Sequence, residues 1–123
     1  MRKHAVPVFF AAALALALLG CQKNTGTATM QAPYVNIYID DEIHAQIPLS
    51  EPQTYTLTQS GDKVNEIVVE EDRVYMQAAT CPEKDCVHQG AVTLENYNER
   101  PLREWIVCLP NRVTVELVAE ESA

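Results

Sequence analysis

The feature that most constrains the fold is a short alternation of apolar and polar residues that recurs along the chain. Val35, Ile37 and Ile39 alternate with Tyr34, Asn36 and Tyr38. An extended strand places alternate side chains on opposite faces, so this pattern is typical of a strand with one buried face. No run in the chain after residue 33 has the three- or four-residue period of an amphipathic helix.

The same reasoning identifies further strands along the chain. Turn residues separate the runs, notably Ser60-Gly61-Asp62 and Pro110-Asn111. The predicted strands are residues 34–39, 43–49, 54–58, 65–70, 74–78, 104–109 and 112–118. Six or seven short strands in about 90 residues predict a small single-domain all-β sandwich or barrel, mainly antiparallel.

Residues 1–20 have the pattern of a secretion signal. Arg2 and Lys3 give a charged start, and an apolar run extends from Val8 to Leu19. That run has about 12 residues, whereas a helix that spans a bilayer needs roughly 20. We therefore predict a signal peptide rather than a retained transmembrane anchor.

The end of this leader, Leu18-Leu19-Gly20-Cys21, resembles the lipobox of bacterial lipoproteins. The resemblance implies cleavage before Cys21 and diacylglycerylation of its thiol, which would attach the chain to the cell membrane on the side facing away from the cytoplasm. The alternative is an ordinary signal peptide with a cysteine nearby. Residues 22–32 are polar and lack apolar periodicity, so residues 21–32 are predicted to be the lipidated cysteine and a flexible tether of about 18 Å.

Residues 33–118 are the predicted β domain, and residues 119–123 a polar tail. Two of the nine basic residues lie in the leader, so the remaining chain carries seven basic and 17 acidic residues, a net charge of −10. This charge argues against nucleic-acid binding, which relies on clustered Lys and Arg. The sequence contains no complete catalytic motif and four glycines in all. We expect a non-catalytic binding or accessory role and no cofactor. The expected partners of the chain are the membrane and another extracytoplasmic protein.

Three cysteines remain after Cys21: Cys81, Cys86 and Cys108. Thiols outside the cytoplasm tend to pair, so the first interpretation is a structural disulfide between two of them. A bond between Cys86 and Cys108, slightly favoured over Cys81 with Cys108, would close a loop of roughly 20 residues and stabilise the fold by about 3 kcal/mol. One thiol would be left over.

Metal binding is the second interpretation. Cys81, Cys86, His88 and Cys108 together offer a Cys3His zinc set, although four residues between the first two cysteines are more than zinc sites usually have. The segment from Cys108 also resembles half of a Rieske iron–sulfur motif, but Asn111 occupies the position where the second histidine is required.

Thiol redox chemistry is the third interpretation. The spacing of Cys81 and Cys86 is not that of a redox-active C-x-x-C pair. The neighbouring carboxylates of Glu83 and Asp85 would also disfavour the reactive thiolate.

Two segments carry a resemblance to a known family. Residues 81–90, CPEKDCVHQG, follow a predicted hairpin, and residues 108–113, CLPNRV, begin near the last turn. In combination they resemble the NusG domain II family of small extracytoplasmic lipoproteins and membrane-anchored proteins of Firmicutes. The resemblance covers nearly all of residues 34–118 and implies a compact β domain similar to the one inserted in some bacterial NusG transcription factors. One departure is Asp41-Glu42, where members often have a turn glycine; another is Ala91-Val92, where an aromatic residue is expected.

Overall fold

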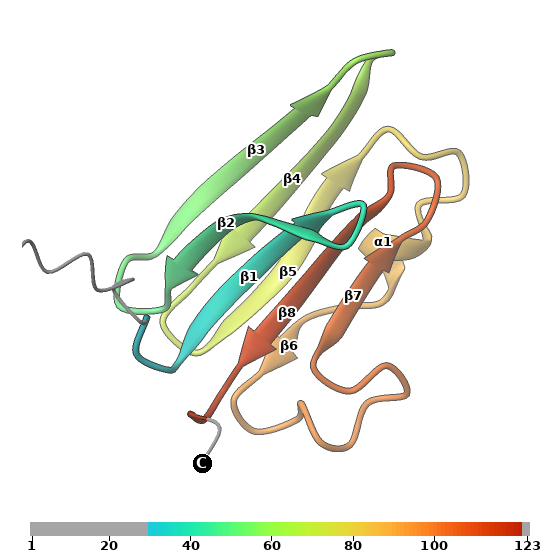
Figure 1. Cartoon of the computed structure of the whole chain (residues 1–123). Coiled ribbons are helices and arrows are strands. Elements are labelled where there is room, and N and C mark those ends of the chain that lie inside the picture. Colours follow the sequence, from blue (N-terminus) through green and yellow to red (C-terminus); the bar gives the residue numbers. More distant parts are fainter. Residues whose placement is uncertain (1–29, 122–123) are drawn as a thin grey trace, which may run out of the picture.

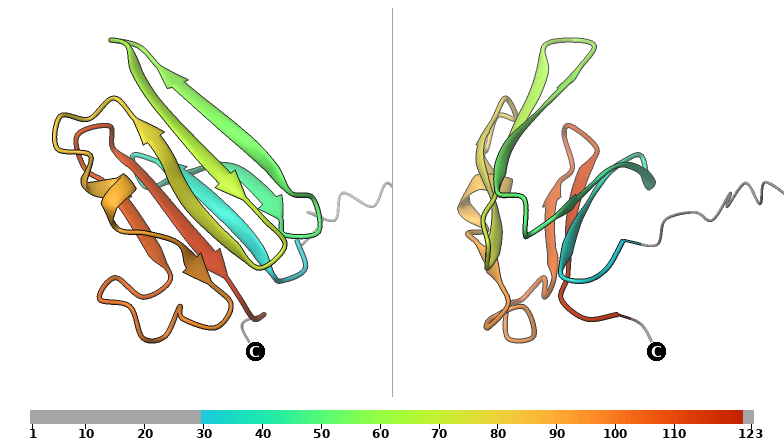
Figure 2. Two further views of the ribbon diagram at one scale, coloured as in Figure 1. Left: turned by 180° about the vertical axis from the view of Figure 1, so that it is seen from behind. Right: turned by 90° about the vertical axis from the view of Figure 1, so that its left-hand side faces the viewer.

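A computed structural model describes residues 30–121, which form two four-stranded sheets packed face to face (Figures 1 and 2). The predicted signal peptide, Cys21 and most of the predicted tether lie outside the described residues, as do the last two residues of the tail. The strands are β1 (Tyr34–Ile39), β2 (Glu42–Pro48), β3 (Gln53–Gln59), β4 (Lys63–Val69), β5 (Arg73–Ala79), β6 (Val92–Thr93), β7 (Trp105–Cys108) and β8 (Val113–Val118).

The first sheet has the strand order β2-β1-β8-β7, and every neighbouring pair is antiparallel. Its two central strands, β1 and β8, are the first and last strands in sequence, and Val35 of β1 lies opposite Leu117 of β8. A tight turn links β1 to β2 through Asp40 and Asp41, which have φ values of 51° and 66°. Aspartate tolerates this left-handed backbone better than most residues, which suits both acidic residues to the turn.

The second sheet has the order β3-β4-β5-β6. Consecutive hairpins build it: β4 pairs with β3 along its full length, and residues 65–69 of β4 pair with β5. A bulge between Glu66 and Ile67 shifts the register against β5. Because side chains alternate across a strand, each hairpin turns Ile67, Val69 and Val74 toward the other sheet, where each is at most 1% exposed.

The core between the sheets is built from the inward faces of both. Val35, Ile37, Ile106 and Val115 of the first sheet are completely buried. Leu57, Met76 and Val92 of the second sheet belong to the same cluster. The prediction of an all-β fold is confirmed, and two open sheets make it a sandwich rather than a barrel.

The structure adds two elements that no periodic pattern indicates. One is β6, which has two residues and raises the strand number to eight. The other is the single-turn helix α1 (Asp85–His88). Both are too short for a period to be visible in the sequence. Within residues 30–121 no helix has the length and apolar character needed to cross a bilayer.

Candidate functional site

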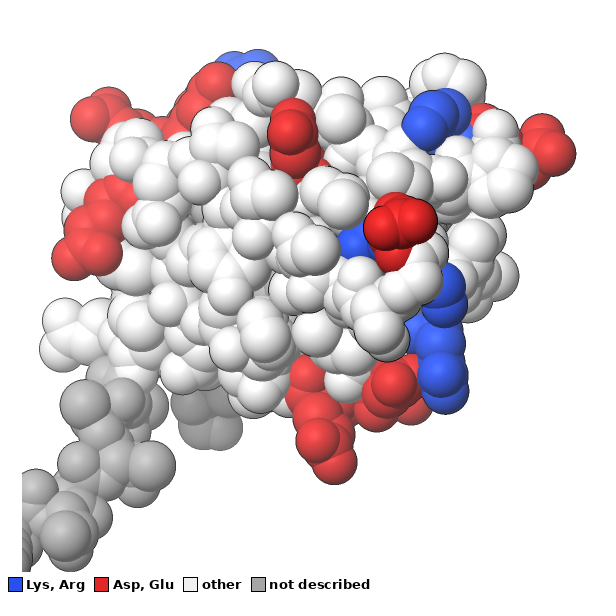
Figure 3. All heavy atoms as spheres, turned by 90° about the horizontal axis from the view of Figure 1, so that it is seen from above, with Lys and Arg blue, Asp and Glu red and all other residues white. Residues whose placement is uncertain are grey.

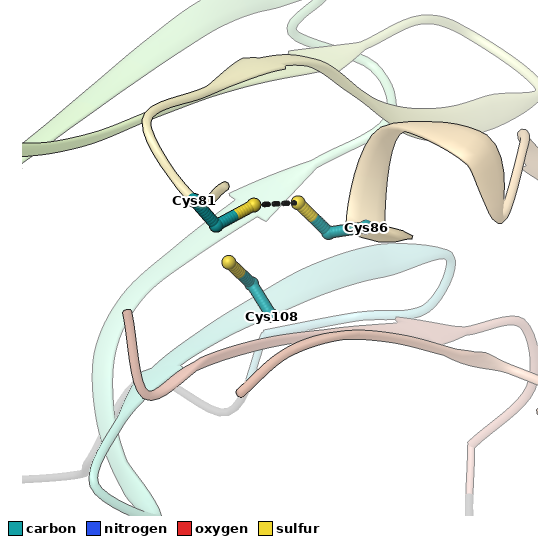
Figure 4. Close-up of side chains that lie close together, drawn as sticks. All are labelled: Cys81, Cys86 and Cys108. Atoms are coloured by element: carbon teal, nitrogen blue, oxygen red, sulfur yellow. Dashed lines mark hydrogen bonds between the residues drawn. The ribbon is translucent and has the colours of Figure 1, made fainter. Parts of the chain in front are cut away.

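Three cysteine side chains converge at one end of the sandwich (Figure 4). Cys81 follows β5 of the second sheet, Cys86 lies in α1, and Cys108 ends β7 of the first sheet. Their three sulfurs all lie within 4.8 Å of one another. Each residue is at most 3% exposed. The sequence-distant Cys108 is thus brought to the pair Cys81 and Cys86 across the interface between the two sheets.

All three side chains are free thiols in the structure. The Sγ atoms of Cys81 and Cys86 are 3.6 Å apart, the distance of a thiol hydrogen bond, whereas a disulfide requires about 2.05 Å. The predicted disulfide therefore stays a prediction, both for Cys86 with Cys108 and for Cys81 with Cys108. In both pairs the two sulfurs lie within 4.8 Å of each other.

His88, the fourth member of the predicted zinc set, does not join the cysteines. It is exposed at the end of α1, and the group of potential ligands contains Cys81, Cys86 and Cys108 without it. The four-residue set from the sequence thus contracts to three sulfurs.

Gln89 holds the helix with Cys86 against the strand with Cys108. Its side-chain Nε2 donates to the carbonyl oxygen of Val107, and its Oε1 accepts from the Val107 N–H, both at 2.8 Å. The amide therefore bonds to β7 as a neighbouring strand would. These two hydrogen bonds hold the end of α1 against Val107, the residue before Cys108.

Arg100 supports the same junction with further hydrogen bonds. Its guanidinium donates to the carbonyl oxygens of Gln89 at 2.9 Å, of Trp105 at 3.0 Å and of Arg103 at 2.6 Å. Burial lowers the pKa of this group. Arg100 thus links the end of α1 to the start of β7 and is part of the framework, not of an anion-binding surface.

Asn111 fixes the turn that follows Cys108. It is 3% exposed, and its Nδ2 donates to Oδ1 of the fully buried Asn65 at 2.9 Å. The backbone carbonyl oxygen of Asn111 accepts a hydrogen bond from Gln59 Nε2 at 2.8 Å. Asn111, which stands where a Rieske motif has a histidine, therefore links the turn after β7 to β3 and β4 of the second sheet. These bonds satisfy its buried amide.

A pocket of about 280 Å³ opens beside the thiols. All three cysteines line it, and Leu102, Leu109 and Pro110 form an apolar wall. Leu109 is 79% exposed and Leu102 is 42% exposed, so this wall reaches the surface. Glu83 and Asp85 supply carboxylates at the same pocket.

The electrostatics of the pocket disfavour an isolated thiolate. Burial raises the pKa of the Cys86 thiol, and the adjacent thiols of Cys108 and Cys81 raise it further. In Figure 3, acidic and basic side chains both lie scattered over the face seen from above, with a broad uncharged area between them. At the pocket itself, the carboxylates of Glu83 and Asp85 disfavour anionic ligands and favour a cation.

Comparison with known proteins gives one family and several solved structures. The family model described as NusG domain II matches residues 8–121. A DUF1312 family protein from Ruminococcus gnavus is 30% identical, with a TM-score of 0.53 and coverage of 68% of this chain and 95% of that one.

Two further structures are similar in fold. A DUF1312 family protein from Enterococcus faecalis is 21% identical, with a TM-score of 0.60 and coverage of 72% and 98%. The Lin0431 protein from Listeria innocua is 22% identical, with a TM-score of 0.57 and coverage of 72% and 97%. These names state no enzymatic activity. No curated protein matches the chain.

Proposed function

The chain belongs to the NusG domain II family, and from that premise we propose that it is a membrane-anchored extracytoplasmic lipoprotein whose β domain is a non-catalytic binding or accessory module. The observation that carries the binding role is the pocket beside the thiols. Its volume of about 280 Å³ is near the lower limit of small-molecule sites, which start at about 300 Å³. A site of this size suits a small ligand or an ion.

The arrangement at the pocket supports binding rather than catalysis. Cys86 is the thiol whose pKa burial raises, which disfavours a nucleophilic thiolate. His88, the histidine nearest in sequence, is exposed and outside the thiol group, so it is not placed to act as a base toward them.

The membrane anchor is tested with Cys21→Ser. Lipidation of Cys21 would hold the chain on the membrane, since two or three acyl chains give stable attachment where one is marginal. We expect the wild-type chain in the membrane fraction of the cells that express it, and accessible to protease added outside. Cys21→Ser should be released or remain unprocessed.

The matched control for the anchor is Thr25→Ala in the predicted tether, which should fractionate as the wild type does. Equal membrane retention of Cys21→Ser and wild type, with the same processed mass, would contradict the lipid anchor. Protection of the wild-type domain from external protease would contradict the extracytoplasmic location.

A second candidate function is a thiol-redox or metal-handling protein. One observation favours it: three buried thiols lie within 4.8 Å of one another, and a single structural disulfide would use two of them. A structural disulfide would leave the third thiol as an apolar member of the core without a bonding partner.

A further inference from the structure

We propose that Cys81, Cys86 and Cys108 bind one divalent thiophilic metal ion of the zinc class through three thiolates, with the fourth coordination position open to the adjacent pocket. The inference deepens the binding role proposed above and rests on it, because it names the ligand class of the same pocket. It differs from the zinc set expected from the sequence, since His88 is exposed and not a ligand.

The sulfur positions fit a tetrahedral ion. With Zn–S bonds of about 2.3 Å, two sulfurs of a tetrahedral site lie about 3.8 Å apart. The Sγ atoms of Cys81 and Cys86 are 3.6 Å apart, and all three sulfurs lie within 4.8 Å of one another. Movements of at most about 1 Å would place all three at coordination distance. A disulfide between any pair would leave the remaining thiol buried and unused.

Hydrogen bonds fix the chain segments that carry the cysteines before any ion binds. Gln89 ties the end of α1 to Val107, next to Cys108, with two bonds of 2.8 Å. The Lys84 ammonium, between Cys81 and Cys86 in sequence, donates to the carbonyl oxygen of Ala79. A preorganised ligand set loses little conformational entropy on binding, which raises metal affinity.

Charge decides between a divalent and a monovalent ion. Three thiolates carry a charge of −3, so a divalent ion leaves −1 at the site and a monovalent ion such as Cu(I) leaves −2. The carboxylates of Glu83 and Asp85 line the same pocket and disfavour the more negative complex. Divalent ions with an affinity for sulfur, of which Zn²⁺ is the usual one in proteins, are therefore favoured.

The pocket gives the site its open position. It borders all three cysteines and is also lined by Leu102 and Leu109. Zinc sites with three protein ligands keep the fourth position for water or an external donor, whereas closed structural sites have four protein ligands. The site is thus suited to pass an ion on or to bind a small donor ligand at the metal.

The test is a zinc titration of the full-length chain carrying Cys21→Ser, so that the reactive thiols are those of the pocket. The protein is purified in detergent, reduced, and titrated without oxygen against a chromophoric chelator. We expect one Zn²⁺ per chain and protection of three thiols from a thiol reagent. Co²⁺ should give a thiolate-to-metal charge-transfer band, a signature that a structural role of the cysteines does not produce.

Single variants identify the ligands. Cys81→Ser, Cys86→Ser and Cys108→Ser should each weaken zinc binding by at least about 100-fold, since even residues that only orient ligands account for 10- to 100-fold. His88→Ala is the matched control and should leave the affinity unchanged. Circular dichroism of each metal-free variant checks that the β fold is retained, and Cys→Ala replaces any serine variant that unfolds.

Three outcomes would overturn the proposal. The first is no retention of zinc by the fully reduced, folded chain. The second is an intramolecular disulfide that persists when zinc is supplied before any oxidant. The third is a loss of affinity in His88→Ala equal to that of the cysteine variants. Because the titrated chain lacks Cys21, the anchor and the metal site can each fail without the other.

Discussion

At the scale of single residues, the cysteines of the site could be predicted from sequence, but their supports could not. The sequence motifs single out Cys81, Cys86 and Cys108, because they are the cysteines of the chain that follow Cys21. Gln89 and Asn111 act through hydrogen bonds to residues 18 and 46 positions away. Such tertiary bonds leave no periodic trace in a sequence. The only sequence feature that pointed to Asn111 was its position directly after Cys108-Leu109-Pro110.

The raised pKa of Cys86 predicts a loss of stability in alkaline solution. Below the ordinary thiol pKa of 9.0, Cys86 is protonated in both the folded and the unfolded chain. Above it the unfolded chain releases the proton while burial keeps the folded thiol neutral, so the free energy of unfolding falls by up to about 1.4 kcal/mol per pH unit. Urea unfolding of the reduced chain with a chelator, at about pH 8 and about pH 10, measures this slope.

Cys86→Ala removes this contribution and should flatten the alkaline slope. Part of the slope should remain, because burial and the bond to Glu116 also raise the pKa of Tyr38. Tyr38→Phe is therefore the matched control and should leave the Cys86 part in place. An equal slope in wild type and Cys86→Ala would contradict the prediction.

At the scale of elements, the strands could be predicted closely because alternation is a local property. The predicted ranges 34–39 and 112–118 correspond to β1 and β8 within one residue at each end. What could not be predicted is β6, whose two residues pair with β5 through Arg73 and Val74. That pairing depends on where the preceding loop places the chain.

The turn between β1 and β2 offers a stabilising substitution. Asp41 has a φ of 66°, a conformation in which glycine is free of the steric cost that side chains carry. Asp41→Gly should raise the free energy of unfolding by about 0.5 kcal/mol, and Asp41→Ala should lower it by about 1 kcal/mol. Urea midpoints of the two variants give the comparison. The same sign of change for both would mean that backbone strain does not govern this turn.

At the scale of the whole molecule, the sequence predicts a β fold with a buried face but leaves sandwich and barrel open. The decision depends on strand order: β1 lies between β2 and β8, and β8 is the last strand of the chain. Residues 34 and 118 pair in the first sheet although they are separated by almost the whole sequence of the domain. Local patterns specify which face of each strand is buried, but not which distant strand is its neighbour.

The sandwich predicts a sharp contrast between two isoleucines only six positions apart. Ile37 of β1 is completely buried between the sheets, and Ile43 of β2 is 54% exposed. Ile37→Ala should lower the free energy of unfolding by about 2–5 kcal/mol, since it removes apolar contacts and leaves a cavity. Ile43→Ala should change it by less than about 0.5 kcal/mol. Urea unfolding measures both, and similar losses would contradict the two-layer packing.

The hydrogen bonds of the Gln89 amide affect whether copies of the domain can pair through β7. A strand at the margin of a sheet exposes N–H and C=O groups that can recruit a strand from another molecule. On β7 the two such groups of Val107 are already occupied by one side chain of the same molecule. If the domain is confined to two dimensions by a lipid, where copies meet often, this margin is closed to edge-to-edge aggregation. Gln89 would then also keep neighbouring copies from pairing through β7.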